Sequence, residues 1–167
     1  MFVVAMLITI IYPILQILFG AHTKEELDLY NKVCQFRERQ GLKVIQLSDS
    51  LSYIGKLHCL NLYQFYDFNE KDCSMHSWYY EKGKSWSAGC YWKNEEVMYS
   101  KPKEILGINK DGFEIAHTHG HKNSPCNSEC CFQAWLNSPG HKEQLLLPYK
   151  KMGVSIYNNY ATIWFTY

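Results

Sequence analysis

Three histidines alternate with other residues in the segment HTHGH, a spacing that could build a metal site. In an extended backbone, alternate side chains point to the same side, so His117, His119 and His121 would share one face. Imidazole is a common ligand of zinc and other transition metals. The neighbouring Gly120 and Lys122 favour a polar loop instead. We therefore expect a loop here, and an accessory metal site made by these three histidines is the alternative.

Cysteines are the second group of reactive side chains, and all seven lie after residue 21. Such a number fits a domain held together by disulfides in an oxidising compartment, and the odd count leaves at least one thiol unpaired. Structural zinc is the rival interpretation, but the sequence has no two CxxC pairs. The seven are Cys34, Cys59, Cys73, Cys90, Cys126, Cys130 and Cys131.

Signatures of conventional hydrolases are missing from the sequence. Ser85 and Ser87 in GKSWSAG do not complete a GxSxG motif, and neither HExxH nor a glycine-rich phosphate loop occurs. The formal net charge is +1, and no cluster of basic residues stands out. We therefore expect no nucleic-acid partner, because binding to nucleic acid depends on a concentrated positive field.

The first twenty residues contain no charged side chain and are predominantly apolar. We interpret residues 1–21 as a signal peptide or an N-terminal membrane anchor, and residues 22–167 as one domain. Gly20 and Ala21 supply the small residues that a signal-peptide cleavage site requires. Both interpretations place the domain outside the cytoplasm, either secreted or held at the membrane by this segment alone.

Hydrophobic periodicity in the remaining chain predicts an α+β fold with a sheet covered by helices. His58 lies on the apolar face of a predicted helix, so we expect a hydrogen-bonded core histidine there. Pro139 and Gly140 should end a helix and leave His141 just beyond the break. The expected elements are helices over 24–40, 48–66 and 128–138, loops and short strands over 67–100, a strand over 113–116, and a hairpin of 153–157 with 161–167.

Trp164 and Phe165 are neighbours in the last predicted strand, so their side chains should point to opposite faces of the sheet. We expect only one of the two to face the central core. Replacement of that residue by alanine should therefore destabilise the protein more than replacement of the other.

Several segments, taken in order, resemble the SCP-like domain of the CAP superfamily (cysteine-rich secretory, antigen 5 and pathogenesis-related-1 proteins), in particular its bacterial-type branch. The resemblance runs from about Leu27 to Tyr167 and implies an α-β-α sandwich with a mainly antiparallel central sheet. The segments that carry it are LSYIGKLHCLNL, HSW, WSAGC, KPKEILG, GFEIA, WLNSPGH, MGVSIY and the closing WF.

The resemblance also implies a cleft that gathers His76 of HSW, Glu114 of GFEIA and His141 of SPGH. Ser138 stands where eukaryotic members carry a second acid. Metal binding by His76 and His141, with zinc the first candidate, is thereby weakened, because a hydroxyl lacks the charge of a carboxylate. Family members of this kind also carry a disulfide at the positions of Cys73 and Cys90.

This family resemblance favours a secreted, non-enzymatic binding module whose ligand is an extracellular protein, lipid or glycan. One alternative is a metal-dependent hydrolase, such as a peptidase, in which His76, Glu114 and His141 activate water. Another is carriage of a sterol or other lipid, which would use the aromatic residues around Trp78 and Trp86.

Overall fold

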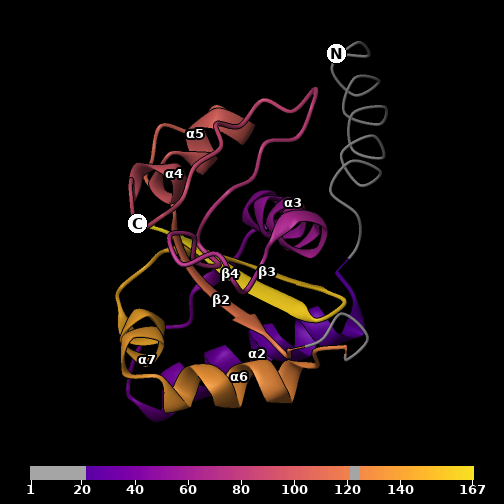
Figure 1. Ribbon diagram of the computed structural model, residues 1–167. Helices are drawn as coiled ribbons and strands as arrows, with labels where there is room; N and C mark the ends of the chain where they lie inside the picture. Colours follow the sequence, from indigo (N-terminus) through magenta and orange to yellow (C-terminus); the bar gives the residue numbers. More distant parts are fainter. Residues whose placement is uncertain (1–21, 121–124) are drawn as a thin grey trace, which may run out of the picture.

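The computed structural model describes residues 22–120 and 125–167 (Figure 1). The predicted leader over residues 1–21 and His121 of the histidine segment lie outside the described residues. In the part of the chain that is described, no helix has the length and apolar character needed to cross a bilayer.

A four-stranded sheet forms the centre of the fold, with the strands in the order β1-β3-β4-β2. Strand β1 runs parallel to β3, and the β3–β4 and β4–β2 pairs are antiparallel. Strand β2 therefore lies at one edge of the sheet, and it carries Glu114 and His117. The strands are β1 (Gln46–Leu47), β2 (Phe113–Thr118), β3 (Lys151–Tyr157) and β4 (Tyr160–Thr166).

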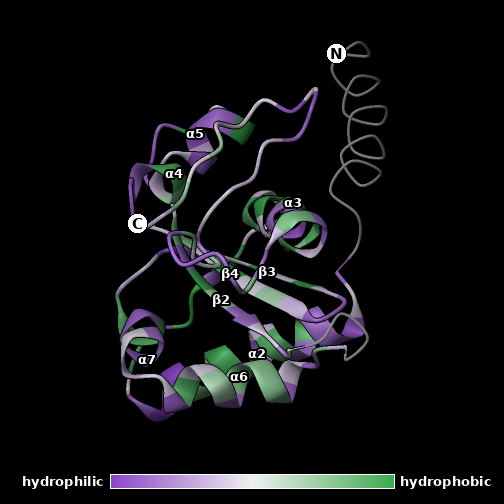
Figure 2. Cartoon of the chain, viewed as in Figure 1, coloured by the Kyte–Doolittle hydropathy of each residue, from purple (hydrophilic) through white to green (hydrophobic). Residues whose placement is uncertain are grey.

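Helices cover both faces of this sheet, so the molecule is the predicted α-β-α sandwich (Figure 1). One face is packed by α2, α6 and α7, and the other by α3, with α4 and α5 farther along the same side. Hydrophobic and hydrophilic segments alternate along the helices in Figure 2, as expected for helices with one face on a core. The helices are α2 (Lys24–Arg39), α3 (Asp49–Phe65), α4 (Glu96–Tyr99), α5 (Lys101–Leu106), α6 (Ser128–Asn137) and α7 (Pro139–Leu146).

Local capping explains why the first helices begin where they do. Thr23 and Glu26 form a reciprocal capping box at the start of α2, and Ser48 caps α3 by accepting from the backbone N–H of Leu51. The predicted ranges of both helices are confirmed to within about one residue. On α2, Leu29 is fully buried and Leu27 is exposed, so the inward face of the helix includes Leu29.

Helix α3 approaches strand β3 closely enough that only glycine fits at Gly153. A Cβ atom at this position would lie 2.1 Å from the backbone nitrogen of Ser52. The Ser52 hydroxyl accepts a hydrogen bond from the backbone N–H of Val154 at 3.0 Å, which fixes the helix on the strand. This contact sets the height of α3 above the sheet and therefore the position of His58.

Both faces of β4 pack against hydrophobic core. Trp164 and Phe165 point to opposite sides, as predicted, but each has no exposed surface. Trp164 packs with Trp78 and Leu51 on the α3 side, and Phe165 stacks on Tyr149 on the other side with ring centroids 4.7 Å apart. The expectation that only one of the two faces a core is wrong, because helices and loops cover both surfaces of the sheet.

The segment between α3 and α4 has little regular structure, as predicted, and the Cys73–Cys90 disulfide closes a loop within it. Inside it, a single β-bridge pairs Trp78 with Gly89. Helix α7 was not predicted. Helix α6 ends at Asn137, so the predicted break is confirmed and His141 lies just beyond it. Pro139 occupies the first turn of α7, where proline needs no N–H partner, so His141 also lies within a second helix.

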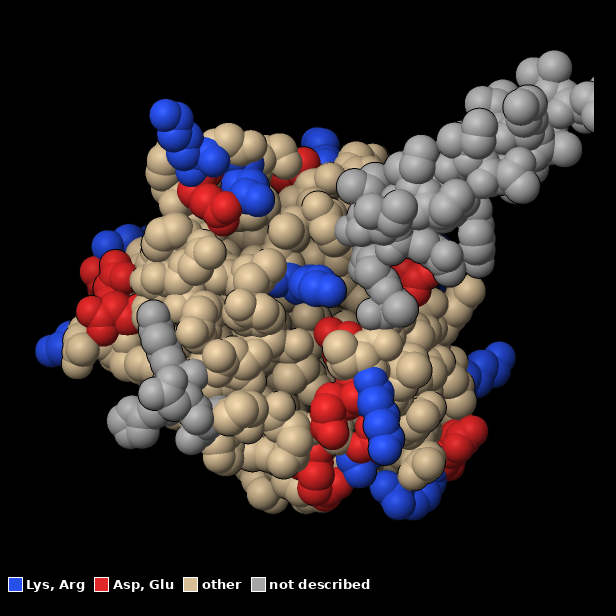
Figure 3. Space-filling view, turned by 90° about the vertical axis from the view of Figure 1, so that its right-hand side faces the viewer, with Lys and Arg blue, Asp and Glu red and all other residues tan. Residues whose placement is uncertain are grey.

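Charged side chains of both signs are interspersed on the face shown in Figure 3, and most of that face carries no charge. On the helical layer, Lys32 of α2 pairs with Asp28 at 3.4 Å and with Glu129 of α6 at 2.7 Å. These ion pairs join α2 to α6 at the surface, where such pairs stabilise a protein by at most about 1 kcal/mol each.

Candidate functional site

Glu114 of the edge strand β2 is the centre of a buried hydrogen-bond network. Its side chain has no exposed surface, and its two oxygens contact different histidines. Oε1 accepts from Nδ1 of His58 on α3, and Oε2 accepts from Nδ1 of His76 at 3.0 Å. The remaining His58 nitrogen, Nε2, donates to the carbonyl of Ser77 at 3.0 Å.

The hydrogen bonds fix the charge state of His58. A carbonyl oxygen can only accept, so Nε2 carries a hydrogen; the Glu114 carboxylate also accepts, so Nδ1 carries one as well. Burial alone would raise the pKa of Glu114, but the charge of His58 and the hydrogen bonds from His58 and His76 outweigh it and lower this pKa. The result is a buried imidazolium–carboxylate pair, and His58 stacks on Trp78 with ring centroids 4.3 Å apart.

His76 is held differently, because only one of its nitrogens faces Glu114. With Nδ1–H donating to the carboxylate, Nε2 is free to accept a hydrogen bond or to bind a ligand. The His76 side chain is 21% exposed, whereas the His58 side chain is fully buried. The hydrogen bond from Nδ1 to the buried Glu114 therefore leaves the opposite side of the His76 ring, with Nε2, toward solvent.

His141 approaches His76 from the first turn of α7, with the two ring centroids 6.4 Å apart. Burial lowers the pKa of His141, and the nearby His76 and His117 lower it further. The imidazole of His141 is therefore neutral at pH 7. The chain thus brings His76, Glu114 and His141 to one place from a loop, a strand and a helix.

These three residues line a cleft of about 240 Å³ at the edge of β2. Aromatic rings and polar groups share its walls. Ser138 is half-buried at the start of α7 and is not among the residues that line the cleft. The lining residues are His76, Tyr91, Met98, Tyr99, Phe113, Glu114, Gly140, His141 and Gln144.

The cleft offers a metal two imidazoles and no third protein ligand. The Glu114 side chain has no exposed surface and each of its oxygens accepts from a histidine, and a zinc site in a protein takes at least three protein ligands. Within residues 22–120 and 125–167, the groups with three ligand atoms within 4.8 Å of one another are His117 with Cys126 and Cys130, and Glu70 with Cys73 and Cys90. The residues of the cleft do not by themselves form a zinc site.

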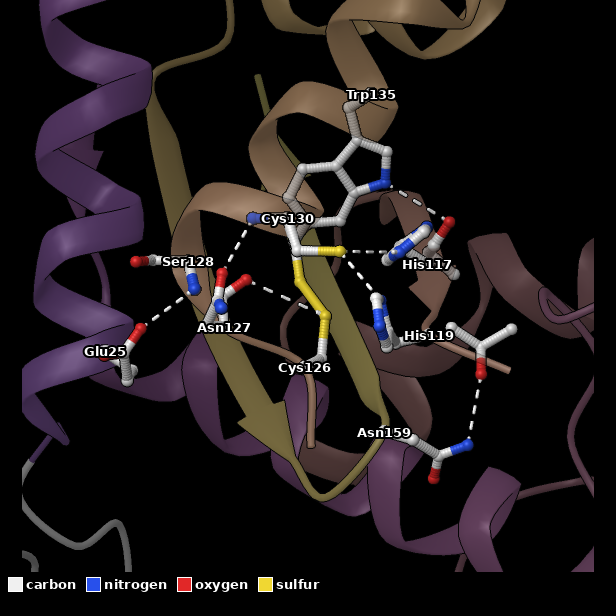
Figure 4. Close-up of a disulfide and its surroundings, with 12 residues drawn as sticks. Glu25, His117, His119, Cys126, Asn127, Ser128, Cys130, Trp135 and Asn159 are labelled. Atoms are coloured by element: carbon white, nitrogen blue, oxygen red, sulfur yellow. Dashed lines mark hydrogen bonds between the residues drawn. A yellow bond between two sulfur atoms is a disulfide. The ribbon is translucent and has the colours of Figure 1, made fainter. Parts of the chain in front are cut away.

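The HTHGH segment differs from the loop that we expected. His117 belongs to β2, and the backbone N–H of His119 donates to the carbonyl of Asn159 at 2.9 Å, which continues the ladder. Both imidazoles therefore point to the same side, where Cys130 of α6 lies (Figure 4). The third histidine, His121, lies outside the described residues.

A scan against protein-family models and a search of curated proteins found no match. Solved structures do match over most of the chain. A cysteine-rich secretory protein from Staphylococcus aureus has a TM-score of 0.55 and 15% identity over 85% of this chain. An extracellular protein from Bacillus anthracis that contains an SCP domain has a TM-score of 0.56 and 14% identity over 88%. The chain has the SCP/CAP fold.

A third match, an outer surface protein from Borrelia burgdorferi, has a TM-score of 0.54 and 19% identity, and the alignment covers 87% of this chain and 95% of that one. The chain spans only 38% of the staphylococcal protein and 44% of the Bacillus protein. At these identities the shared property is the SCP/CAP fold, and the chemistry of the cleft depends on this chain's own residues.

Sequence reasoning did not connect His58 with Glu114. It correctly predicted a buried, hydrogen-bonded histidine, but no local pattern joins a helix residue to a strand residue 56 positions later. Cys130 was also not singled out, although an odd number of cysteines next to alternating histidines was a usable signal. Tyr91 and Gln144 carry no sequence signature of a cleft.

Proposed function

We propose that this chain is an extracellular binding module whose cleft receives one small group of its ligand, such as a sugar ring or a peptide side chain. The observation that carries the proposal is the orientation of His76, whose free Nε2 faces the cleft because buried Glu114 holds Nδ1. Together with neutral His141, it offers directional hydrogen bonds between aromatic walls.

Export is the first part of the proposal, and three observations support it. Residues 1–21 have the composition of a signal peptide or anchor. The Cys73–Cys90 disulfide is typical of an oxidising compartment. Similar structures belong to proteins described as secretory, extracellular or outer-surface. Secretion from a host cell, followed by N-terminal sequencing, tests this part; a protein that stays in the cytoplasm contradicts it.

Binding fits the cleft better than hydrolysis. The Glu114 side chain has no exposed surface and both of its oxygens accept from histidines, so the carboxylate is poorly placed to take a proton from water. The residues that line the cleft include no serine, threonine or cysteine nucleophile. The metal-dependent peptidase alternative would also need a third protein ligand.

The size of the cleft argues against a sterol or another whole lipid. Pockets that enclose a drug-sized ligand measure about 300–1,000 Å³, and this cleft measures about 240 Å³. A single sugar ring fits such a volume, and Tyr91 and Tyr99 can pack against its apolar face. We therefore place a glycan or a peptide side chain ahead of a lipid.

The binding test is a two-dimensional NMR titration with N-acetylglucosamine and, separately, with a short tyrosine-containing peptide. We expect one of these probes to shift the amide signals of His76, Tyr91 and His141. His76→Ala and His141→Ala should weaken this binding by at least about tenfold, the effect of about 1.4 kcal/mol. Lys142→Ala, at an exposed position beside His141, is the matched control and should bind normally. Binding that both histidine variants retain contradicts the cleft as the site, as does the absence of shifts with either probe.

A further inference from the structure

Outside the cleft, His117, His119 and Cys130 lie close together where strand β2 meets the start of helix α6. Asn127 caps this helix and accepts from the backbone N–H of Cys130 at 2.8 Å. Consecutive residues on a helix point about 100° apart, so the two adjacent cysteines have different surroundings. Cys131 is fully buried and forms a disulfide with Cys126, while Cys130 is a free, half-buried thiol that faces the end of β2 (Figure 4).

The imidazoles of His117 and His119 both lie close to the sulfur of Cys130. Nδ1 of His119 lies 2.9 Å from Sγ, and Nε2 of His117 lies 3.9 Å from it. A zinc ion bound at about 2.0–2.1 Å to nitrogen and about 2.3 Å to sulfur holds these atoms about 3.6 Å apart in tetrahedral geometry. The two observed separations lie on either side of this value. His119 is not part of the group of ligand atoms within 4.8 Å of one another that His117 forms with Cys126 and Cys130, so the rings of His117 and His119 must turn toward each other when a metal binds.

The turn between β3 and β4 holds the strand and the cysteine segment together. The side-chain amide of Asn159 donates to the Gly120 carbonyl at 2.9 Å and to the Thr118 hydroxyl at 3.2 Å. The backbone N–H of Cys126 donates to the carbonyl of Asn158 at 2.8 Å. The same turn therefore holds the segment that carries the histidines and the segment that carries the cysteines. Because these segments are already held together, the entropic cost of bringing the metal ligands together is lower.

We propose that His117, His119 and Cys130 bind a zinc-type divalent cation, with water at the fourth position. The Sγ of Cys126 is close to these ligands but is already bonded in the Cys126–Cys131 disulfide. On binding, the Cys130 thiol loses its proton to solvent and the thiolate donates an electron pair to the metal, while both imidazoles bind through a neutral nitrogen. One proton is therefore released for each ion bound, and affinity should rise with pH.

The other free thiols among the described residues do not offer such a site. Cys34 and Cys59 are buried, and burial raises the pKa of Cys59 to about 12. Cys130 differs from both because it is accessible and has two imidazoles as neighbours. This site uses none of the residues that line the Glu114 cleft, so it can hold whether or not the cleft binds a ligand.

Cobalt(II) titration of the exported protein tests the proposal, because a cobalt–thiolate bond produces a strong charge-transfer band in the near ultraviolet. We expect this band to saturate at one equivalent, to disappear in Cys130→Ser and to require at least about tenfold more cobalt in His119→Ala. The His22→Ala variant is the matched control, since the His22 ring contacts Ser52 on α3 instead, and it should titrate like the wild type.

Circular dichroism confirms that each variant is folded, and His119→Ala alters an exposed side chain, so it should fold even if Cys130→Ser does not. The absence of the band from the wild type overturns the proposal. It is also overturned if the folded Cys130→Ser or His119→Ala variant titrates like the wild type, or if peptide mapping finds Cys130 in a disulfide.

Discussion

Two groups of histidines lie along strand β2, and their immediate neighbours differ. In the first group, which we call the Glu114 cleft (His76, Glu114 and His141), a buried carboxylate lies beneath the imidazoles and occupies a nitrogen of His76. In the second, the Cys130 cluster (His117, His119 and Cys130), no carboxylate intervenes and both imidazoles face a thiol directly. The same residue type therefore meets a buried carboxylate in one group and a free thiol in the other.

The supports of the two groups differ as well. The Glu114 cleft rests on a fully buried layer of His58, Trp78 and Trp164, which lies between α3 and the sheet. The Cys130 cluster lies near the end of the β3–β4 hairpin, and His119 is exposed. A change in the core should therefore disturb the first group and spare the second.

The largest effect is expected from the tryptophan beneath the cleft. Trp164→Ala should lower the free energy of unfolding by about 3–5 kcal/mol, because it leaves a cavity in a packed core. Urea denaturation measures this. Phe165→Ala should cost a similar amount on the opposite face of β4. A difference of several kcal/mol between the two would show that one face is not a true core.

Removal of the charge of Glu114 should have the next largest effect. Glu114→Gln keeps the shape of the side chain but leaves the buried imidazolium of His58 without its counter-ion, so we expect a loss of about 3 kcal/mol. The matched change in the other group, His117→Gln, should cost less than about 1 kcal/mol in the absence of metal, because His117 is only half-buried. Equal losses of unfolding free energy in the two variants would contradict the proposed difference between the two groups.

Zinc should stabilise the protein through the Cys130 cluster. At a free concentration one hundred times its dissociation constant, a ligand that binds only the folded state contributes about 2.7 kcal/mol. Thermal unfolding with zinc and with a chelator measures the gain, which should vanish in Cys130→Ser and persist in Trp164→Ala. Zinc stabilisation of Cys130→Ser equal to that of the wild type would place the metal elsewhere.

Acid should affect the Cys130 cluster and the Glu104 carboxylate of α5 in different pH ranges. Zinc should dissociate as the pH falls and protons compete for its ligands; burial, with a smaller effect from His119, lowers the pKa of His117 below its usual 6.5. Glu104, which belongs to neither group, titrates lower. Burial alone would raise the pKa of Glu104, but hydrogen bonds from Lys101, Ser100 and Ser87 lower it from 4.5 to about 2. Since the folded-state pKa is depressed, its stabilising contribution is complete above 4.5 and is lost as the pH falls toward 2.

Unfolding measured from pH 7 to pH 2, with and without zinc, should therefore show two separate losses of stability, the first smaller than the second. The loss below pH 4.5 should be reduced in Glu104→Gln. A zinc effect that persists unchanged down to about pH 4 would contradict imidazole and thiolate ligation.

Most of the framework could be predicted from the sequence. Thr23 and Ser48 are local capping signals, and β-branched and aromatic runs reveal the last hairpin, so neither needs knowledge of distant contacts. Helix α7 was missed because Pro139 indicates both the end of one helix and the first turn of another. The Cys73–Cys90 disulfide was predicted from the family resemblance and is confirmed by the structure.

The sites were harder to predict than the framework. The resemblance named His76, Glu114 and His141, and the fold brings them together, but their function stays a proposal. The sequence spacing does not predict that His58 contacts Glu114. It also does not predict that Cys126 pairs with Cys131 instead of Cys130. Both depend on which side of a helix meets the sheet, and that is a property of the tertiary packing.

One measurement tests the distinction between the two groups most directly: a zinc titration followed by NMR of the histidine ring nitrogens. We predict that one equivalent of zinc shifts the signals of His117 Nε2 and His119 Nδ1. The Nδ1–H signal of His76, which is bonded to Glu114, should stay in place. If the first equivalent instead shifts His76 and His141 and leaves His117 and His119 unchanged, the Glu114 cleft is the metal site and the assignment of zinc to the Cys130 cluster is wrong.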